Sequence, residues 1–177
     1  MRDLSTPVII RPAKVVDAQA IAEVHVHSWQ WAYRGLLPDD YLDHLSIERR
    51  AEMHTQRLAT ETEERTWVAD QEGQIVGFAI TGPSRDPDVS PRTAEIMAIY
   101  LRREATGKGI AHALFVHAVQ DLWQRGYEQS TLWVLEGNAR ARRFYEKAGW
   151  VPNGTTKTEE RPGALLREVR YHASRRA

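Results

Sequence analysis

The segment from Thr93 to Phe115 constrains the fold of this chain more than any other stretch of its 177 residues. An apolar, strand-like run that contains the carboxylate Glu95 leads through Arg102 and Arg103 into the glycine-rich residues 106–111, which open an amphipathic helix. Glycines let backbone N–H groups approach a ligand closely, and a helix start adds unpaired donors and a partial positive charge. The segment therefore predicts a strand, a turn and a helix that together bind a phosphate-like anion.

Two familiar phosphate-binding loops do not fit this segment. A P-loop requires Ser or Thr directly after its Gly-Lys pair, whereas Gly109 follows Lys108 here. The dinucleotide-binding fingerprint requires a third glycine where this chain has His112. The alternatives that remain are another class of anion site and a plain turn between a strand and a helix.

Composition limits the class of protein. Lys plus Arg and Asp plus Glu number 24 each, so a nucleic-acid-binding surface is not expected. There is no cysteine, and His25 and His27 diverge on a helix, so no metal site is expected. The first residues lack the apolar core of a signal peptide, and no run approaches the length of a membrane span. These features predict one cytoplasmic domain over residues 1–177 with no membrane partner.

Strand-like and helix-like segments alternate along the rest of the chain. Strands are expected at 8–11, 66–69, 74–81 and 129–135, with closing strands after 150 and at 165–171; helices are expected at 17–32, 39–43, 46–58 and 138–148. Asp17 is expected to cap the first helix, and the proline-rich segment 82–92 is expected to be a mobile surface loop. The helix after Asp17 and the helix after the glycines have apolar faces that are expected to pack on a sheet.

The segment from Asn138 to Trp150 carries the most specific pattern in the chain. Its sequence, Asn-x-x-Ala-x-x-Phe-Tyr-Glu-Lys-x-Gly-Trp, closely resembles motif B of the GNAT superfamily of N-acetyltransferases. Gly109 and Ala111 resemble the end of the family's motif A. Thr106 stands where the family has Gln or Arg, so only the backbone part of that motif is expected to act. The order of the predicted elements also matches the family, so the resemblance covers nearly the whole chain.

The resemblance implies an α/β domain of the GNAT fold, with a single mixed, largely antiparallel sheet of about seven strands and about four flanking helices. In that fold the two central strands splay apart and hold acetyl-CoA, which is the expected cosubstrate. The residues expected to bind it are Ile99, Tyr100, Leu101, Arg102, Gly107, Lys108, Gly109, Ile110, Ala111 and Asn138. A helix-capping role for Asn138 and a solvated surface position for Arg102 and Lys108 are the alternatives.

The reaction that the resemblance implies is direct attack of a primary amine on the acetyl thioester, without a covalent enzyme intermediate. An alkylamine has a pKa of about 10 and a thiol one of about 8.5, so the amine needs a proton acceptor and the departing thiolate benefits from a donor. Glu95 is the expected acceptor, acting through a water, and Tyr145 is the expected donor. A structural ion pair for Glu95 and a core position for Tyr145 are the alternatives.

The segment from Trp29 to Asp43 combines aromatic and acidic residues, which suits a cationic amine through ring faces and ion pairs. Trp29, Tyr33 and Arg34 are expected to bind the acceptor, unless the aromatic rings fill the core. A small-molecule amine is therefore the expected partner. The alternatives are acetylation of a protein N-terminus or lysine, a non-catalytic acyl-CoA sensor, and a nucleotide-binding module. Strand edges near the C-terminus offer a surface for a possible homodimer.

Overall fold

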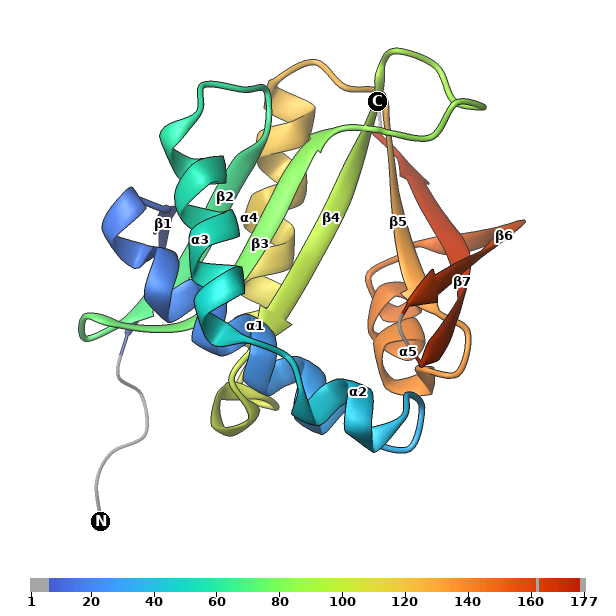
Figure 1. Ribbon diagram of the computed structural model, residues 1–177. Helices are drawn as coiled ribbons and strands as arrows, with labels where there is room; N and C mark the ends of the chain where they lie inside the picture. Colours follow the sequence, from blue (N-terminus) through green and yellow to red (C-terminus); the bar gives the residue numbers. More distant parts are fainter. Residues whose placement is uncertain (1–6, 162, 176–177) are drawn as a thin grey trace.

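The computed structural model describes residues 7–161 and 163–175, and helices flank both faces of a seven-stranded sheet (Figure 1). The strands are β1 (Val8–Pro12), β2 (Arg65–Gln71), β3 (Gln74–Pro83), β4 (Thr93–Leu101), β5 (Gln129–Leu135), β6 (Val151–Arg161) and β7 (Ala164–Ser174). The helices are α1 (Ala18–Ala32), α2 (Asp39–Asp43), α3 (Ile47–Ala59), α4 (Ile110–Gln124) and α5 (Ala139–Lys147), with single 3-10 turns η1 (Val15–Asp17) and η2 (Arg103–Ala105). Within the described residues, no helix is long and apolar enough to cross a membrane.

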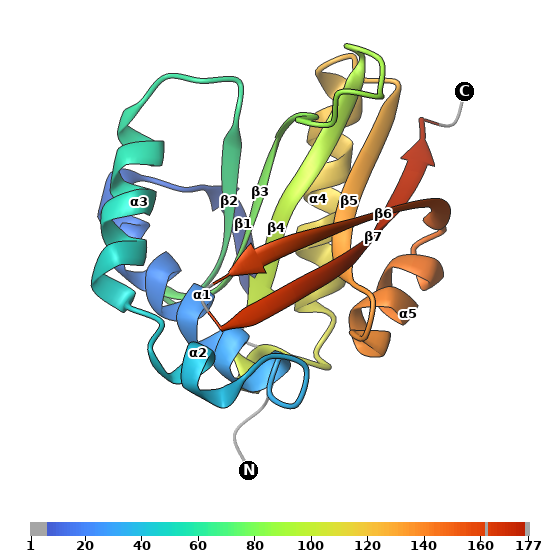
Figure 2. The same cartoon turned by 45° about the vertical axis from the view of Figure 1, so that its right-hand side comes forward.

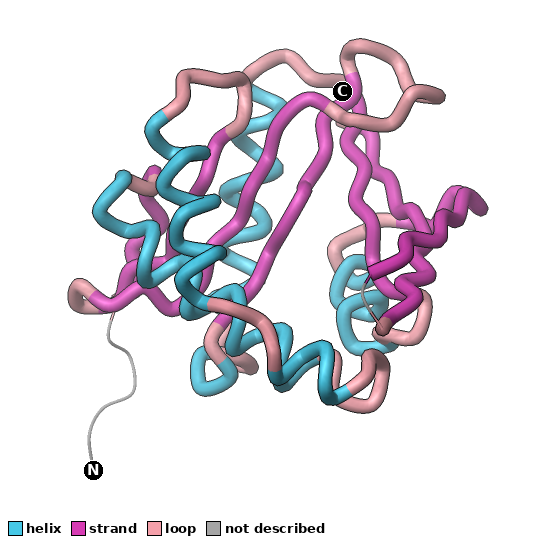
Figure 3. Tube along the Cα trace, in the orientation of Figure 1, coloured by secondary structure: helices cyan, strands magenta, loops and turns pink. Residues whose placement is uncertain are grey.

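The strands lie in the order β1-β2-β3-β4-β5-β7-β6, and Figure 3 shows them in two groups that meet at one end. Neighbouring strands are antiparallel except for β4 and β5, which run parallel. A parallel pair requires a crossover connection, which α4 supplies. The predicted α/β fold with a mixed, largely antiparallel sheet of about seven strands is confirmed.

The two parallel strands at the centre of the sheet pair over only part of their length. The ladder runs from Thr93 opposite Gln129 to Ile96 opposite Leu132 and then ends. A β-bulge at Met97 in β4 shifts its register against β3 at this point. Bulges bend the strand that carries them, and Figure 1 shows β4 and β5 diverging below the paired segment. The divergence exposes main-chain groups of β4 to a potential ligand.

The helices form two layers on opposite faces of the sheet (Figures 1 and 2). Leu114 and Ala118 of α4 are buried against one face, and Ile21 and Val24 of α1 are buried against the other. Tyr145 of α5 joins the core on the α4 side. The space between the diverging strands is therefore bordered by α4 and α5 on one face and by α1 on the other.

The hairpin of β6 and β7 reaches across the α1 side of the sheet, as Figure 2 shows. Leu166 of β7 packs in a cluster with Leu37 and Leu42, which flank α2 or lie in it, and with Leu135 of β5. Leu166 is 4% exposed and Leu42 is fully buried. The hairpin therefore closes over the α1 side of the diverging strands.

The β2–β3 turn has ordinary hairpin geometry, whereas the start of α1 lacks the expected cap. The β2–β3 turn has positive φ at Glu72 (54°) and Gly73 (83°), the arrangement that matches the twist of a two-residue hairpin. Asp17 precedes α1, but its side chain makes no capping hydrogen bond to that helix. Its carboxylate instead accepts from Arg11 at 2.8 Å and from the Lys14 amide at 2.7 Å. A charge partner in β1 therefore takes the place of the predicted cap.

The loop between β3 and β4 is anchored, contrary to the expectation of a mobile loop. Asp86 accepts a hydrogen bond from the indole N–H of Trp133 at 3.1 Å. Arg170, which is 4% exposed, contacts Asp86 at 3.1 Å and Asp88 at 2.7 Å and 2.6 Å. Two aspartates of this proline-rich loop thus serve as ion-pair partners for a buried arginine on β7.

Candidate active site

The edge of β4 that faces β5 has free main-chain groups beyond the bulge. The amide of Arg102 donates to the carbonyl oxygen of Val76 at 2.8 Å, which makes these two residues a hydrogen-bonded pair. Such pairs alternate along an antiparallel ladder with pairs whose main-chain groups point outward. By the observed register, the main chain of Tyr100 faces β3, whereas that of Ile99 and Leu101 faces the opening. The structure therefore places Ile99 and Leu101, and not the backbone of Tyr100, where a ligand can pair with β4.

The start of α4 forms an open cradle of amides. Gly107 and Gly109 have left-handed φ values of 77° and 79°, and Gly109 is the N-cap. The amide of Ala113 donates to the Gly109 carbonyl at 3.0 Å, so the amides of residues 110–112 lie before the first amide that has an intrahelical acceptor. A Cβ added at Gly109 would meet no atom within 4 Å. Free amides, the helix dipole and this open space fit the phosphate groups of coenzyme A.

The basic side chains near this cradle differ in their availability. Arg102 donates to the carbonyl of Ile75 at 3.0 Å and pairs with Glu23 at 3.2 Å, so its guanidinium ties β4 to β3 and α1. This placement favours a structural role over the predicted contact with the cofactor. Lys108 and Arg103 are exposed beside the cradle, where their charge is available to an anion.

Helix α5 carries both predicted residues of the second motif. The side chain of Asn138 accepts a hydrogen bond from the Ala141 amide at 3.1 Å, so it caps the helix as expected of that residue type. Tyr145 is 8% exposed and packs in the core beside Phe115, with ring centroids 5.7 Å apart. Its hydroxyl makes no hydrogen bond to any described residue. Burial raises the pKa of Tyr145, which keeps the phenol protonated at neutral pH.

Three phenols and one carboxylate converge at the opening between β4 and β5. Burial raises the pKa of Tyr33, and Tyr100, Tyr145 and Glu168 raise it further. Burial also raises the pKa of Tyr100, against the opposing effect of the polar groups of Tyr33 and Trp29. Tyr33 follows α1, Tyr100 lies in β4, Tyr145 in α5 and Glu168 in β7, so the elements that border the opening from both faces each supply one of these groups. The group combines protonated donors with an ionisable acceptor, as acyl transfer to an amine requires.

The predicted acceptor residues divide into two groups. The Trp29 ring lies 4.9 Å from that of Tyr33 and 6.2 Å from that of Tyr100, between centroids, so both predicted aromatics reach the opening. Arg34 instead pairs with Asp39 at 3.1 Å and Asp43 at 2.8 Å on exposed parts of α2. The structure brings Trp29 and Tyr33 together with the site but engages Arg34 in a surface ion-pair cluster.

Glu95 lies on β4 at the closed end of the opening, where β4 and β5 are still paired. Its side chain is 3% exposed. Arg85 donates to its carboxylate from Nη2 at 2.6 Å, from Nε at 3.1 Å and from the backbone amide at 3.2 Å. This placement favours a structural ion pair over the predicted role as proton acceptor, since both carboxylate oxygens already accept hydrogen bonds.

Sequence reasoning missed Glu168, which is 19% exposed and has Lys157 as an ion-pair partner at 3.4 Å. In the sequence it alternates with Leu166 and Arg170, a pattern that is typical of many strand faces. Only the position of β7 beside the opening distinguishes it. The side chain of Tyr100 was also missed, because the resemblance assigned this residue a main-chain contact only.

His54 of α3 has a buried partner in His25 of α1. The Nδ1 atom of His25 lies 3.1 Å from Nε2 of His54, and the His25 ring stacks on Tyr100 at 5.2 Å between centroids. Burial, together with the charges of nearby arginines, lowers the pKa of His25 to about 2 and that of His54 to about 4. The two imidazoles are therefore neutral, and they pack against the aromatic residues of the site through the contact of His25 with Tyr100.

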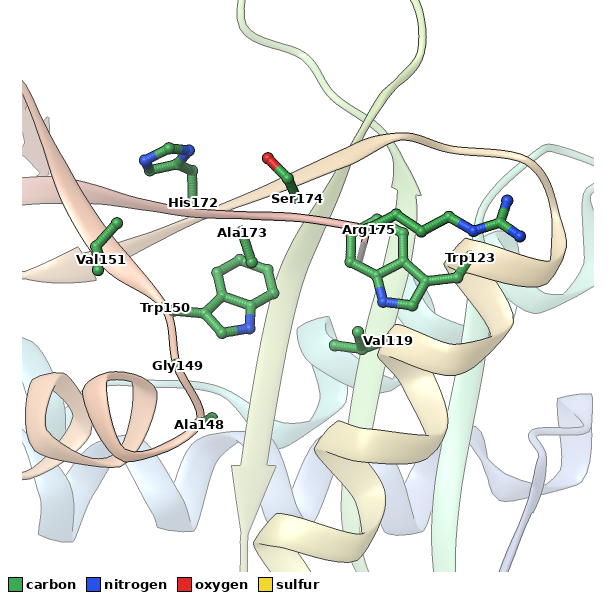
Figure 4. A pocket seen from close by; sticks show the side chains of 10 residues that line it. All are labelled: Val119, Trp123, Ala148, Gly149, Trp150, Val151, His172, Ala173, Ser174 and Arg175. Carbon is green, nitrogen blue, oxygen red and sulfur yellow. The ribbon is translucent and has the colours of Figure 1, made fainter. Parts of the chain in front are cut away.

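A separate pocket of about 620 Å³ lies between α4, the α5–β6 turn and the end of β7 (Figure 4). Its lining residues are Val119, Trp123, Ala148, Gly149, Trp150, Val151, His172, Ala173, Ser174 and Arg175. None of them is among the predicted site residues. The pocket is thus distinct from the group of residues that borders the opening between β4 and β5.

Comparisons with known proteins agree on one family. The model of the family described as Acetyltransferase (GNAT) matches residues 24–150. A Bacillus subtilis protein named as the uncharacterized N-acetyltransferase YuaI is 34% identical over 132 residues, which are 74% of this chain and 73% of that protein. The spermidine N(1)-acetyltransferase of Thermoplasma acidophilum is 22% identical over 169 residues, or 93% of this chain and 98% of that protein. The crystal structure of the PaiA N-acetyltransferase from Thermoplasma acidophilum with coenzyme A has the same fold, with a TM-score of 0.73 at 21% identity, covering 96% of this chain and 99% of that one.

Proposed function

Because the chain belongs to the GNAT family of acetyltransferases and is an acetyl-CoA-dependent N-acetyltransferase, we propose that its acceptor is a small molecule with a primary amine. Acetyl-CoA supplies an activated acetyl thioester, and the amine attacks it directly while both substrates are bound. The acceptor enters from the α1 side of the sheet, opposite the helices that border the coenzyme.

The packing of the β6–β7 hairpin against the segment around α2 carries this proposal. Leu166 is buried with Leu37 and Leu42 across the α1 side of the opening. A polypeptide acceptor requires an open groove for several residues, whereas a small amine fits beneath such a cover. Trp29 and Tyr33 lie beside the cover and present aromatic rings, which favour a cation.

A relative supports the same class of acceptor. The Thermoplasma acidophilum protein that aligns over 93% of this chain is named as a spermidine N(1)-acetyltransferase. Spermidine is a small polyamine, and the carboxylates and aromatic rings near the opening suit such a cation. We therefore place polyamines and comparable small amines first among the candidate acceptors.

The proposed roles of the residues follow from their positions. The amides of residues 107–111 hold the phosphates, and the main chain of Ile99 and Leu101 pairs with the extended arm of the coenzyme. Tyr145 supports the departing thiolate and then gives it a proton, because its hydroxyl has no described partner and stays protonated. Asn138 caps α5 and so fixes the direction from which Tyr145 approaches.

Mass spectrometry of reaction mixtures tests the proposal. The protein is incubated with acetyl-CoA and a pool of spermidine, other polyamines, aminoglycosides, amino acids and short peptides, with Tyr145→Phe as the matched control. Acetylation of a small amine, reduced in the control, is the expected result. Acetylation of peptides alone would favour a protein acceptor. Absence of any product, with calorimetry showing that acetyl-CoA binds, would contradict the proposal and favour an acyl-CoA sensor.

A further inference from the structure

Glu168 of β7 lies across the opening from the aromatic residues. It is opposite Leu135 of β5 and Lys157 of β6 in the two ladders, and the β4–β5 ladder has already ended at Leu132. Side chains alternate along a strand, so Glu168 shares a face with Leu166, which packs toward α1 and α2. The carboxylate therefore lies on the proposed acceptor side, at a level where the central strands have separated.

The surroundings of Glu168 favour a proton-accepting role. Its side chain is 19% exposed, with Lys157 at 3.4 Å as its ion-pair partner. Burial raises the pKa of Glu168, Lys157 opposes this effect, and Glu159 and Glu95 raise the pKa further. Tyr33, just past α1, packs against the cluster that contains Leu166, and the charge of Glu168 raises the pKa of both Tyr33 and Tyr100. A carboxylate with a raised pKa holds a proton more firmly than an ordinary one, which improves a base that works near neutral pH.

Glu95 offers the same chemical group in an unsuitable setting. Three donors of Arg85 occupy its two oxygens, so a proton can be accepted only if some of these hydrogen bonds are given up. Glu168 is less tightly paired than Glu95, since its one described ion-pair contact is that to Lys157 at 3.4 Å.

We propose that Glu168 is the general base of the reaction and that Tyr33 and Tyr100 orient the acceptor amine beside it. This assignment rests on the proposed function. The ammonium form of the acceptor gives one proton to the Glu168 carboxylate, and its nitrogen lone pair then forms the C–N bond to the thioester carbonyl carbon. The C–S bond breaks, the thiolate takes a proton from Tyr145, and the second proton on the new amide nitrogen returns to the tyrosinate through solvent. Glu168 finally releases its proton to water, so the net products are the amide, the thiol and one proton.

The pH dependence of kcat/KM in Glu168→Gln tests the assignment, with spermidine or whichever pool member the parent acetylates as the acceptor. In the parent, kcat/KM falls with decreasing pH as the base becomes protonated. Glu168→Gln should lower kcat/KM about 100-fold near neutral pH and remove this acid limb. Glu168→Asp should keep the limb at a lower rate, because it retains an ionisable group.

Glu159→Gln is the matched control, since Glu159 is a neighbouring carboxylate that pairs with Arg161 at 2.7 Å. It should keep the plateau rate and an acid limb, which moves only to slightly lower pH because the charge of Glu159 raises the pKa of Glu168; circular dichroism checks the fold of every variant. If Glu168→Gln retains the parent's rate and limb, the assignment is wrong while the proposed function stands. If Glu95→Gln alone loses the limb, Glu95 is the base instead. If the parent acetylates no amine, the proposed function fails and the assignment with it.

Discussion

Tyr145 is the residue whose local setting gives most support to its proposed role as proton donor to the thiolate. Its hydroxyl makes no hydrogen bond to any described residue, and burial raises the pKa of the phenol. A donor to the thiolate acts mainly in the transition state, so removing it should affect kcat more than ground-state binding. Tyr145→Phe is therefore expected to lower kcat about 10- to 100-fold while the Kd for acetyl-CoA, measured by calorimetry, stays within about two-fold.

The control for this variant is Tyr127→Phe. Tyr127 packs against the same core cluster as Tyr145, and Arg125 lies over its ring at 5.4 Å. Loss of its hydroxyl should leave kcat unchanged. Equal kcat values for the two variants would remove Tyr145 from the mechanism.

The buried pair His25–His54 makes the stability of the protein sensitive to acid. Both folded pKa values are lowered, to about 2 and about 4, whereas an unfolded histidine titrates near 6.5. As pH falls from about 6.5 toward 4, the unfolded chain takes up protons that the folded chain excludes. The free energy of unfolding should therefore decrease by up to about 1.4 kcal/mol per pH unit for each histidine.

Urea denaturation between pH 7 and pH 4.5 measures this slope. His54→Gln should reduce it by about half, because one of the two linked titrations is removed. His27→Gln, at an exposed position on the same helix as His25, should leave the slope unchanged. A parent slope that matches that of His54→Gln would show that the buried pair does not carry the acid sensitivity.

Among the elements, the start of α4 is the one most directly tied to ligand charge. Gly109 has a φ of 79°, and a Cβ there meets no protein atom within 4 Å, so a side chain adds backbone strain and intrudes on the ligand space. Asn and Asp tolerate this conformation similarly and differ in charge. Gly109→Asp should weaken acetyl-CoA binding about ten-fold more than Gly109→Asn, a difference of about 1.4 kcal/mol.

Gly126, just past the other end of α4, provides a position of similar geometry. Its φ is 89°, and a Cβ there is also free of contacts within 4 Å. Gly126→Asp should therefore share the strain and leave the affinity, measured by calorimetry, unchanged. Equal affinities for Gly109→Asp and Gly109→Asn in folded proteins would place the phosphates elsewhere.

The elements were largely predictable because their signals are local. The apolar periodicity of α4, the N-cap at Asn138 and the glycine at 149 lie within short stretches of sequence, and the two motifs linked them to a known fold. The pairing of side chains was not predictable. Arg85 reaches Glu95, and His25 meets His54 across two helices; such contacts depend on the tertiary structure and have no periodic signature.

On the scale of the whole molecule, the sheet consists of two parts that meet at one end of the site. Strands β1–β4 and strands β5–β7 are joined by the short ladder from Thr93–Gln129 to Ile96–Leu132. Arg170 adds a link from β7 to the β3–β4 loop, and the β6–β7 hairpin adds another to α2. Beyond these links the parts separate, so a ligand between β4 and β5 contacts both.

Binding of acetyl-CoA should therefore stabilise the whole molecule and protect particular amides. A ligand at 100 times its Kd adds about 2.7 kcal/mol to the free energy of unfolding. Hydrogen exchange should slow at Ile99 and Leu101, whose amides face the opening by the observed register, whereas Tyr100, already paired with β3, should change little beyond the global stabilisation. Gly109→Asp at the same acetyl-CoA concentration serves as the weak-binding control. Protection that appears equally at all three residues, or only outside β4, would contradict the proposed path of the coenzyme along this strand.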